Sequence, residues 1–357
     1  MEKPFRVGII GTGFGRLVQG PGFREHPEFE LVGIASARRE RAEDAARELG
    51  VAYATDNWKK MLDELEMDLV SVITPPVQHH PMGMRVLESG RDLLLEKPTA
   101  MNAGQAGQLL RAAQAHGRVH ALNHEFRWVP ARAAMQARAA SGAMGRILRV
   151  ELRGLFDFYN GTMPRPWGWL CDASMGGGIL GALGSHYVDF VRFVAGEITA
   201  VTARTVTQVP SRKDAAGVDR ACTADDGFTL MLELESGALG LIECSAALSG
   251  RRETVEIHGE KESLILENDQ LKIVRPGGQP EPCAIPPELE IRRHSADARL
   301  DPFYAFLDAL APRLRDRKPF TPSLVDGLRV QQVLDGARLS SRTGSRVELA
   351  GEAAGAR

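Results

Sequence analysis

Five short apolar segments alternate with helical patterns over the first 122 residues. The segments between them, such as residues 38–50 and 80–90, have helical periodicity and end in glycine. Strands that alternate with helices in this way form a parallel sheet with helices on both faces. This alternation predicts an α/β domain over residues 1–122. Its predicted strands are FRVGII (5–10), FELVGIA (29–35), DLVSVIT (68–74), DLLLE (92–96) and RVHAL (118–122).

The length of 357 residues corresponds to about two domains. From Asn123 the pattern changes to a mixture of helices and alternating strands, which predicts an α+β domain over residues 123–350. Whether its last helices pack back on the first domain is left open, and residues 351–357 are expected to be a loose tail. The predicted helices are 130–142, 184–195, 302–315 and 322–341, and the strand regions are 146–154, 196–206, 226–246 and 253–267.

Composition excludes several classes of protein. The net charge is −2, so no basic field indicates nucleic-acid binding, and no apolar run approaches the ~20 residues of a membrane span. The N-terminal apolar run is too short and too rich in glycine for a signal peptide. The cysteines are widely spaced without a CxxC motif, which favours reduced thiols in a cytoplasmic protein. They are Cys171, Cys222, Cys244 and Cys283.

The first predicted strand runs directly into GTGFGR, residues 11–16. Gly11 would allow a tight turn, and Gly13 would let backbone N–H groups approach a pyrophosphate at a helix N-terminus. Arg16 stands where the usual fingerprint has its third glycine, and an ordinary glycine-rich turn is the alternative. We predict a dinucleotide-binding turn. Its expected contacts are Gly11, Thr12, Gly13, Phe14 and Gly15.

The second predicted strand ends in ASARR rather than in an acidic residue. A carboxylate at this point would bind the ribose 2′-hydroxyl of NAD and repel a 2′-phosphate. Ser36, Arg38 and Arg39 would instead bind a 2′-phosphate through charge-assisted hydrogen bonds. The alternative is that the two arginines only begin a solvated helix. The sequence therefore predicts NADP as the cofactor and leaves NAD possible.

The fourth predicted strand ends in EKP (96–98), at the sheet edge where ligands bind in open α/β folds. Lys97 beside a nicotinamide ring could donate a hydrogen bond to the substrate oxygen as hydride moves. Pro98 could fix the direction of the lysine, through a cis peptide bond. The alternative is a surface lysine paired with Glu96.

Five motifs occur in order along the chain: GTGFG (11–15), TPPVQH (74–79), EKP (96–98), NHEFRWVP (123–130) and GGGILGALGSHYVD (176–189). Together they resemble those of the Gfo/Idh/MocA (glucose–fructose oxidoreductase, inositol dehydrogenase, rhizopine catabolism) family, and the resemblance covers nearly the whole chain. It implies a Rossmann domain followed by a domain with an open, mostly antiparallel sheet, NAD(P)-dependent oxidation or reduction of sugars or polyols, and a homo-oligomer, either a dimer or a tetramer.

The resemblance assigns catalysis to Lys97, with Pro98 as its cis-proline neighbour, and to His186. The family pattern GGGxLxDxGxH has an acid four residues before the histidine, where helical spacing would put both on one face. Here that position is Ala182. His186 could still act as general base with Asp189 orienting it. The alternative is that the activity is lost and the chain is a dinucleotide-sensing regulatory protein.

The cleft has further candidates. Arg127 could clamp a substrate or make an interdomain ion pair with Glu125 or another acid, and Trp167 or Trp169 could stack on a sugar. No metal is expected, because adjacent histidines at 79 and 80 point apart. Besides the turn residues, the expected cofactor contacts are Ser36, Arg38, Arg39, Thr74, Pro75, His79, Glu96, Lys97, Pro98, Asn123 and Arg127. The expected substrate contacts are Lys97, Arg127, Tyr159, Trp167 and His186.

These features predict an NADP(H)-dependent oxidoreductase for a small sugar, polyol or related hydroxy or carbonyl compound. Lys97 would polarise the substrate oxygen and His186 would take or give the proton. A third reading is a lyase or hydrolase whose nicotinamide is oxidised and reduced within each turnover.

Overall fold

The computed structural model describes residues 3–162, 165–291, 295 and 297–349, which excludes the predicted loose tail. The chain forms two compact units. The first contains Met1–Trp128 and Ile291–Leu328, and the second contains Val129–Glu290 and Arg329–Arg357. The first unit thus includes residues 123–128 and a late segment that the sequence analysis placed in the second domain.

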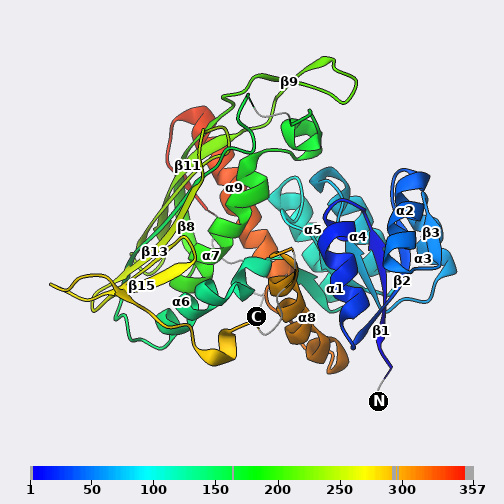
Figure 1. The fold of residues 1–357 in the computed structure, drawn as a ribbon, viewed down its shortest axis with the longest axis horizontal. Helices are drawn as coiled ribbons and strands as arrows, with labels where there is room; N and C mark the ends of the chain where they lie inside the picture. The colour runs from blue at the N-terminus through cyan, green and yellow to red at the C-terminus, as the bar shows by residue number, and fades with distance from the viewer. Residues whose placement is uncertain (1–2, 163–164, 292–294, 296, 350–357) are drawn as a thin grey trace. The chain divides into compact units, whose positions relative to one another are not determined.

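The first unit contains a six-stranded parallel sheet in the order β3-β2-β1-β4-β5-β6. The chain order reverses between β1 and β4, which is where open α/β sheets bind ligands at their carboxyl edge. The five predicted strands are confirmed. β3 was missed because three residues are too few to give a pattern. The strands, blue to cyan in Figure 1, are β1 (Phe5–Ile10), β2 (Phe29–Ala35), β3 (Tyr53–Thr55), β4 (Leu69–Val72), β5 (Asp92–Leu95) and β6 (His120–Leu122).

An aromatic cluster joins α1 to α8 in this unit. Phe23 and Phe303 meet edge to face with ring centroids 5.6 Å apart, and Phe306 stacks beside Phe303 at 5.7 Å. All three rings are fully buried. The helices of the unit are α1 (Gly20–Glu25), α2 (Arg39–Leu49), α3 (Trp58–Glu64), α4 (His79–Glu88), α5 (Ala103–Ala115) and α8 (Leu300–Arg315), and α9 (Leu324–Thr343) contributes residues to both units.

The second unit contains a nine-stranded sheet in the order β16-β15-β14-β13-β7-β12-β11-β8-β17, green and yellow in Figure 1. It is mostly antiparallel, as predicted, and only β7 and β12 pair in parallel among its described strands. The strands are β7 (Ile147–Leu155), β8 (Ile198–Val206), β11 (Gly227–Leu234), β12 (Leu239–Ser245), β13 (Arg252–Gly259), β14 (Ser263–Glu267), β15 (Gln270–Val274), β16 (Glu281–Pro282) and β17 (Val347–Glu348).

Helices α6 (Pro130–Ala140) and α7 (Ser185–Ala195) pack on each other, and α7 lies against β7 and β12. The Ser211–Lys213 and Asp219–Ala221 segments form a separate two-stranded ribbon, β9 and β10. No helix within the described residues is long and apolar enough to cross a lipid bilayer.

Truncating the aromatic cluster should destabilise the first unit. Phe303→Ala should lower its free energy of unfolding by roughly 3–5 kcal/mol, because it removes a fully buried ring and leaves a cavity. Leu17→Ala is the control, since Leu17 is 57% exposed and its loss should change the free energy by less than about 0.5 kcal/mol. Denaturant unfolding of both variants measures this, and similar losses in the two would contradict the packing account.

Candidate functional site

The turn after β1 has the properties of a phosphate-binding turn. Gly11 has φ +116°, and a Cβ on it would lie 2.3 Å from the carbonyl oxygen of Ile73, so only glycine fits. At Gly13, by contrast, a Cβ would meet no described atom within 4 Å, which leaves its backbone approachable. A π-turn, Gly15–Gln19, follows and leads into α1, and no described side chain caps its N-terminus at Phe14. These N–H groups therefore fit the pyrophosphate of a dinucleotide.

The end of β2 lies beside this turn. The Ser36 hydroxyl is 3.0 Å from the Thr12 hydroxyl, so the two predicted contacts are neighbours. Arg38 is exposed immediately before α2, and Arg39 makes an ion pair at 2.8 Å with Glu43 on the same helix. An exposed pair of this kind contributes at most about 1 kcal/mol, so it does not prevent Arg39 from binding a stronger anion.

His79 links the carboxyl ends of β4 and β5. Its Nδ1 lies 2.8 Å from the Pro98 carbonyl oxygen and its Nε2 lies 2.7 Å from that of Thr74. Burial lowers the pKa of His79 to about 4, so the neutral ring donates to one of these carbonyls at a time. The peptide bond between Lys97 and Pro98 is cis, as the resemblance implies. His79, expected to contact the cofactor, thus has both ring nitrogens directed at protein carbonyls.

Thr74 and Pro75 follow β4 and lead into a short 3-10 helix, Pro76–Gln78. The Thr74 hydroxyl donates to the Met82 sulfur at 3.7 Å. The two residues remain at the carboxyl edge of the sheet, where the sequence analysis expected them to meet a cofactor.

Glu96 is a buried carboxyl group at the end of β5, 7% exposed. Gln19 Nε2 and Asn123 Nδ2 donate to its Oε1 at 2.7 and 2.5 Å, and the Lys97 backbone N–H donates to its Oε2 at 3.3 Å. Burial raises the pKa of Glu96, and the Lys97 charge and these hydrogen bonds oppose that shift. Glu96 is thus buried, whereas the side chain of Lys97 is partly exposed.

Glu125 belongs to the NHEFRWVP motif, which was expected near the sheet edge, but it was given no role beyond pairing with Arg127. It begins a 3-10 helix, Glu125–Trp128, just after β6, and is 5% exposed. Burial and the neighbouring Glu96 charge raise the pKa of Glu125 to about 8, while Lys97 and Arg299 oppose the shift. The signal in the sequence was a glutamate three residues after the end of a predicted strand, at the ligand-binding edge.

Arg127 makes an ion pair with Asp326, an acid other than Glu125, which the sequence analysis also allowed. Its Nη2 lies 3.0 Å from Asp326 Oδ1, and both residues belong to the first unit, so this pair is not interdomain. Asp326 also accepts hydrogen bonds from the Thr321 hydroxyl and the Ser323 backbone N–H. Arg127 therefore holds the segment that leads into α9.

His186 lies in the second unit, in the first turn of α7, and is buried. A π-turn, Leu180–Gly184, precedes α7 without a break. Ala182 lies on this π-helical turn, four residues before His186. Asp189 is also buried on α7.

Asp225 is a structural residue that the sequence analysis missed. Its Oδ2 accepts a hydrogen bond of 2.7 Å from the Leu180 backbone N–H at the start of the π-turn. A Cβ on Gly178 would lie 2.3 Å from Asp225 Oδ1, which explains a glycine there. Burial raises the pKa of Asp225 to about 6. Asp225 thus fixes the start of the segment that leads to His186.

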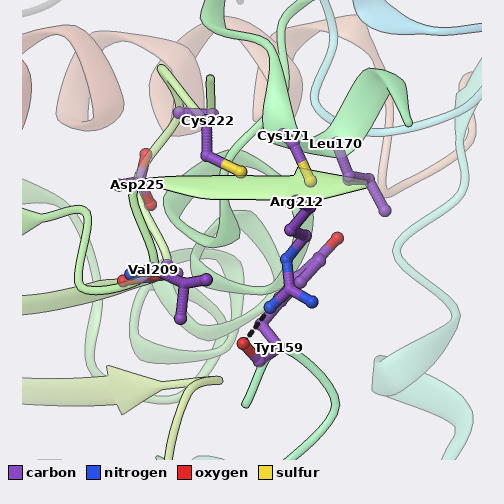
Figure 2. A pocket seen from close by; sticks show the side chains of 9 residues that line it. Tyr159, Leu170, Cys171, Val209, Arg212, Cys222 and Asp225 are labelled. Carbon is purple, nitrogen blue, oxygen red and sulfur yellow. Dashed lines mark hydrogen bonds between the residues drawn. The ribbon is translucent and has the colours of Figure 1, made fainter. Parts of the chain in front are cut away.

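Tyr159 and Trp167 have partners within the second unit. Figure 2 shows Tyr159 at a small pocket that Cys171, Arg212, Cys222 and Asp225 also line. The guanidinium carbons of Arg165 and Arg212 lie 4.6 and 5.3 Å from the centre of the Tyr159 ring, and Arg212 donates to its carbonyl oxygen.

Trp167 braces the β9–β10 ribbon rather than presenting its indole nitrogen to solvent. Its Nε1 donates to the Ala221 carbonyl oxygen at 3.0 Å, and its backbone N–H donates to the Lys213 carbonyl oxygen at 2.7 Å. Trp169, the other aromatic candidate, is 37% exposed.

The buried His79 should make the protein acid-sensitive. The unfolded ring has a pKa near 6.5 and the folded ring about 4, so between these values the unfolded chain binds the extra proton and stability falls as pH falls. From pH 7 to pH 5 this amounts to about 2 kcal/mol. His79→Gln should be less stable than wild type at pH 7 but should lose about 2 kcal/mol less than wild type on going to pH 5. Urea titrations at both pH values test this, and equal losses in the two proteins would contradict it.

Two family models match the chain. One, described as an oxidoreductase family with an NAD-binding Rossmann fold, matches residues 5–124, and the GFO/IDH/MocA C-terminal domain matches residues 132–265. Together they cover well over half of the chain, and each falls mainly in one of the two units.

Relatives match along most of their lengths. The uncharacterized oxidoreductase sll0816 of Synechocystis sp. is 29% identical over 344 residues, covering 92% of each chain. Levoglucosan dehydrogenase of Pseudarthrobacter phenanthrenivorans is 29% identical over 294 residues, covering 75% of each chain. A structure of levoglucosan dehydrogenase with NADH and levoglucosan matches with a TM-score of 0.88 at 24% identity, covering 98% of this chain and 100% of that one, which shows a common fold. The chain belongs to the Gfo/Idh/MocA family of oxidoreductases with an NAD-binding Rossmann fold.

Proposed function

We propose that the protein transfers hydride between NADP(H) and a carbon that bears a hydroxyl or carbonyl group in a sugar, polyol or related compound. The observation that carries this proposal is the position of Lys97. It follows β5 directly, beside the buried Glu96, at the same sheet edge as the glycine turn after β1. Hydride transfer needs a cationic or hydrogen-bonding group where negative charge develops on the substrate oxygen.

The cofactor would be held by the first unit. Backbone N–H groups of residues 11–15 would bind the pyrophosphate, and Ser36, Arg38 and Arg39 would bind the 2′-phosphate. When bound, the nicotinamide accepts or gives the hydride. Contacts from Thr74, Pro75 and Asn123 at the carboxyl edge remain part of the proposal, whereas His79 would act by holding the strand ends that carry them.

Lys97 and His186 have separate roles in the proposed reaction. The Lys97 ammonium group would donate a hydrogen bond to the substrate oxygen and stabilise its negative charge. His186 would accept the hydroxyl proton during oxidation and return it during reduction. The Glu96 carboxylate would fix Lys97, and Asp225 would fix the start of the helical segment that carries His186.

The proposed substrate class follows from the relatives, since one of them is named for its action on levoglucosan, an anhydrosugar. Arg127, Tyr159 and Trp167 are weaker candidates for substrate contacts because each already has protein partners. Lys97 and His186 therefore carry the proposed substrate contacts.

We also propose a homo-oligomer in the cytoplasm. Leu148, Met231 and Leu239 are exposed apolar side chains on strands of the nine-stranded sheet, which supports contact with a second copy. All four cysteines are free thiols, which fits a reducing compartment.

A second candidate function is a dinucleotide-sensing regulatory protein, which Ala182 favours because the family acid is absent there. Ala182→Asp distinguishes the two. An increase in turnover would support the enzyme, and unchanged dinucleotide binding without turnover in either protein would support the regulator.

Removing the Lys97 charge should abolish most turnover without removing the cofactor. Lys97→Met should lower kcat by roughly 10²–10³-fold, the usual cost of losing one donor to a developing oxyanion. Steady-state absorbance of reduced nicotinamide with levoglucosan, aldoses and polyols measures this, and fluorescence titration measures NADPH binding. Turnover within a few-fold of wild type would contradict the assignment of Lys97.

Cofactor preference should depend on Arg38. Arg38→Ala should weaken NADPH binding by about 10-fold or more, because a charge-assisted hydrogen bond is lost, and should leave NADH binding unchanged. Arg47→Ala, at the far end of α2, is the matched control. Equal Kd values for NADPH in wild type and Arg38→Ala would contradict the predicted preference for NADP.

A further inference from the structure

Two carboxyl groups are buried close to Lys97 in the first unit, yet the proposed mechanism uses only one of them. Glu96 and Glu125 are 7% and 5% exposed, and their charges act on each other and on Lys97. Asn123 lies between them in sequence, and its backbone N–H bonds the Leu95 carbonyl oxygen at 2.9 Å, which brings the end of β6 against the end of β5.

The hydrogen bonds to Glu96 identify it as the ionised member of the pair. The Ser71 hydroxyl donates to Gln19 Oε1 at 2.5 Å, which leaves the Gln19 NH₂ group to donate to Glu96. Asn123 and the Lys97 backbone N–H also donate to the Glu96 oxygens. Three donors directed at one carboxyl group stabilise its anionic form.

The surroundings of Glu125 instead favour its neutral, protonated form. A second anion buried beside Glu96 is unfavourable, so the pair retains one proton, as interacting carboxyl groups do. The positive charges of Lys97 and Arg299 favour ionisation of Glu125. Arg299, however, also makes an ion pair with Asp297, in which its Nη2 lies 2.5 Å from Oδ2. On the same 3-10 helix as Glu125, Arg127 is paired with Asp326.

We propose that Glu125 is a positioning residue for Lys97. It remains a neutral carboxylic acid at neutral pH, so that it adds no second negative charge near Lys97, and the ammonium group can donate to a substrate oxygen. When Glu125 loses its proton to solvent, a second anion attracts the ammonium group and weakens that donation. This role rests on the proposed function of Lys97.

If Glu125 must stay neutral, kcat/KM should decrease at alkaline pH. Above about pH 8, where Glu125 ionises, kcat/KM of the wild type should fall by about tenfold per pH unit. Glu125→Gln has a neutral side chain of the same shape at every pH. Its kcat/KM at pH 9 should therefore stay within about threefold of its own value at pH 7.

A structural role for Glu125 predicts a different result. Loss of packing alone would lower kcat/KM by the same factor at every pH and leave the alkaline limb in place. Glu88→Gln, at the exposed end of α4, is the matched control and should follow the wild-type profile. An alkaline limb retained in Glu125→Gln would overturn the proposal.

A second measurement does not need turnover. In protein labelled with ¹³C at lysine Cε, the Lys97 signal is identified by its loss in Lys97→Met. In the cofactor-free wild type it should shift with a midpoint near pH 8 as Glu125 ionises, and this step should vanish in Glu125→Gln. The same step in both proteins would overturn the proposal even if no substrate were found. Wild-type turnover that Lys97→Met does not reduce would instead overturn the proposed function of Lys97.

Discussion

The first unit depends on the burial of one carboxylate at the end of β5. A buried anion is costly unless hydrogen bonds and a nearby cation compensate it. Gln19 from the segment after the glycine turn and Asn123 from the end of β6 both donate to Glu96, and Ser71 on β4 orients Gln19. Glu96 therefore couples three neighbouring strands to the turn that fits a dinucleotide, and it fixes the backbone from which Lys97 projects.

Each unit uses buried polar groups to hold its candidate catalytic residue. In the first unit His79 joins the ends of β4 and β5 through two carbonyl groups, and in the second Asp225 caps the π-turn before α7. The family acid is replaced by Ala182 on that π-turn. In the proposed reaction, charge compensation would then fall on Glu96, Lys97 and Glu125, which all lie in the first unit.

Local patterns in the sequence predicted most of the fold. Apolar runs identified five of the six parallel strands, and the alternating pattern over 226–246 identified the region of β11 and β12. The strand YAT at 53–55 was too short to detect. The run 253–267 formed two strands because the chain turns between Gly259 and Glu262, whose backbone groups are hydrogen-bonded at 2.9 Å.

The candidate site was predicted less completely because side-chain partners come from distant parts of the sequence. The glycine turn and Lys97 have local signals, whereas the ion pair of Arg127 with Asp326 spans 199 residues. Glu125 and Asp225 stand out because their carboxyl groups are buried, and the sequence does not show which acidic residues will be buried. The π-turn before His186 was equally hidden, since one extra residue per turn leaves no compositional mark.

The most direct test of hydride transfer uses a sugar deuterated at its reacting carbon, starting with levoglucosan, together with NADP⁺ and the purified protein. Mass spectrometry of the recovered cofactor then shows whether deuterium has moved to the nicotinamide. The account predicts deuterated NADPH from wild type and far less from Lys97→Met. Bound cofactor that stays unlabelled with every sugar and polyol, while remaining oxidised, would contradict it.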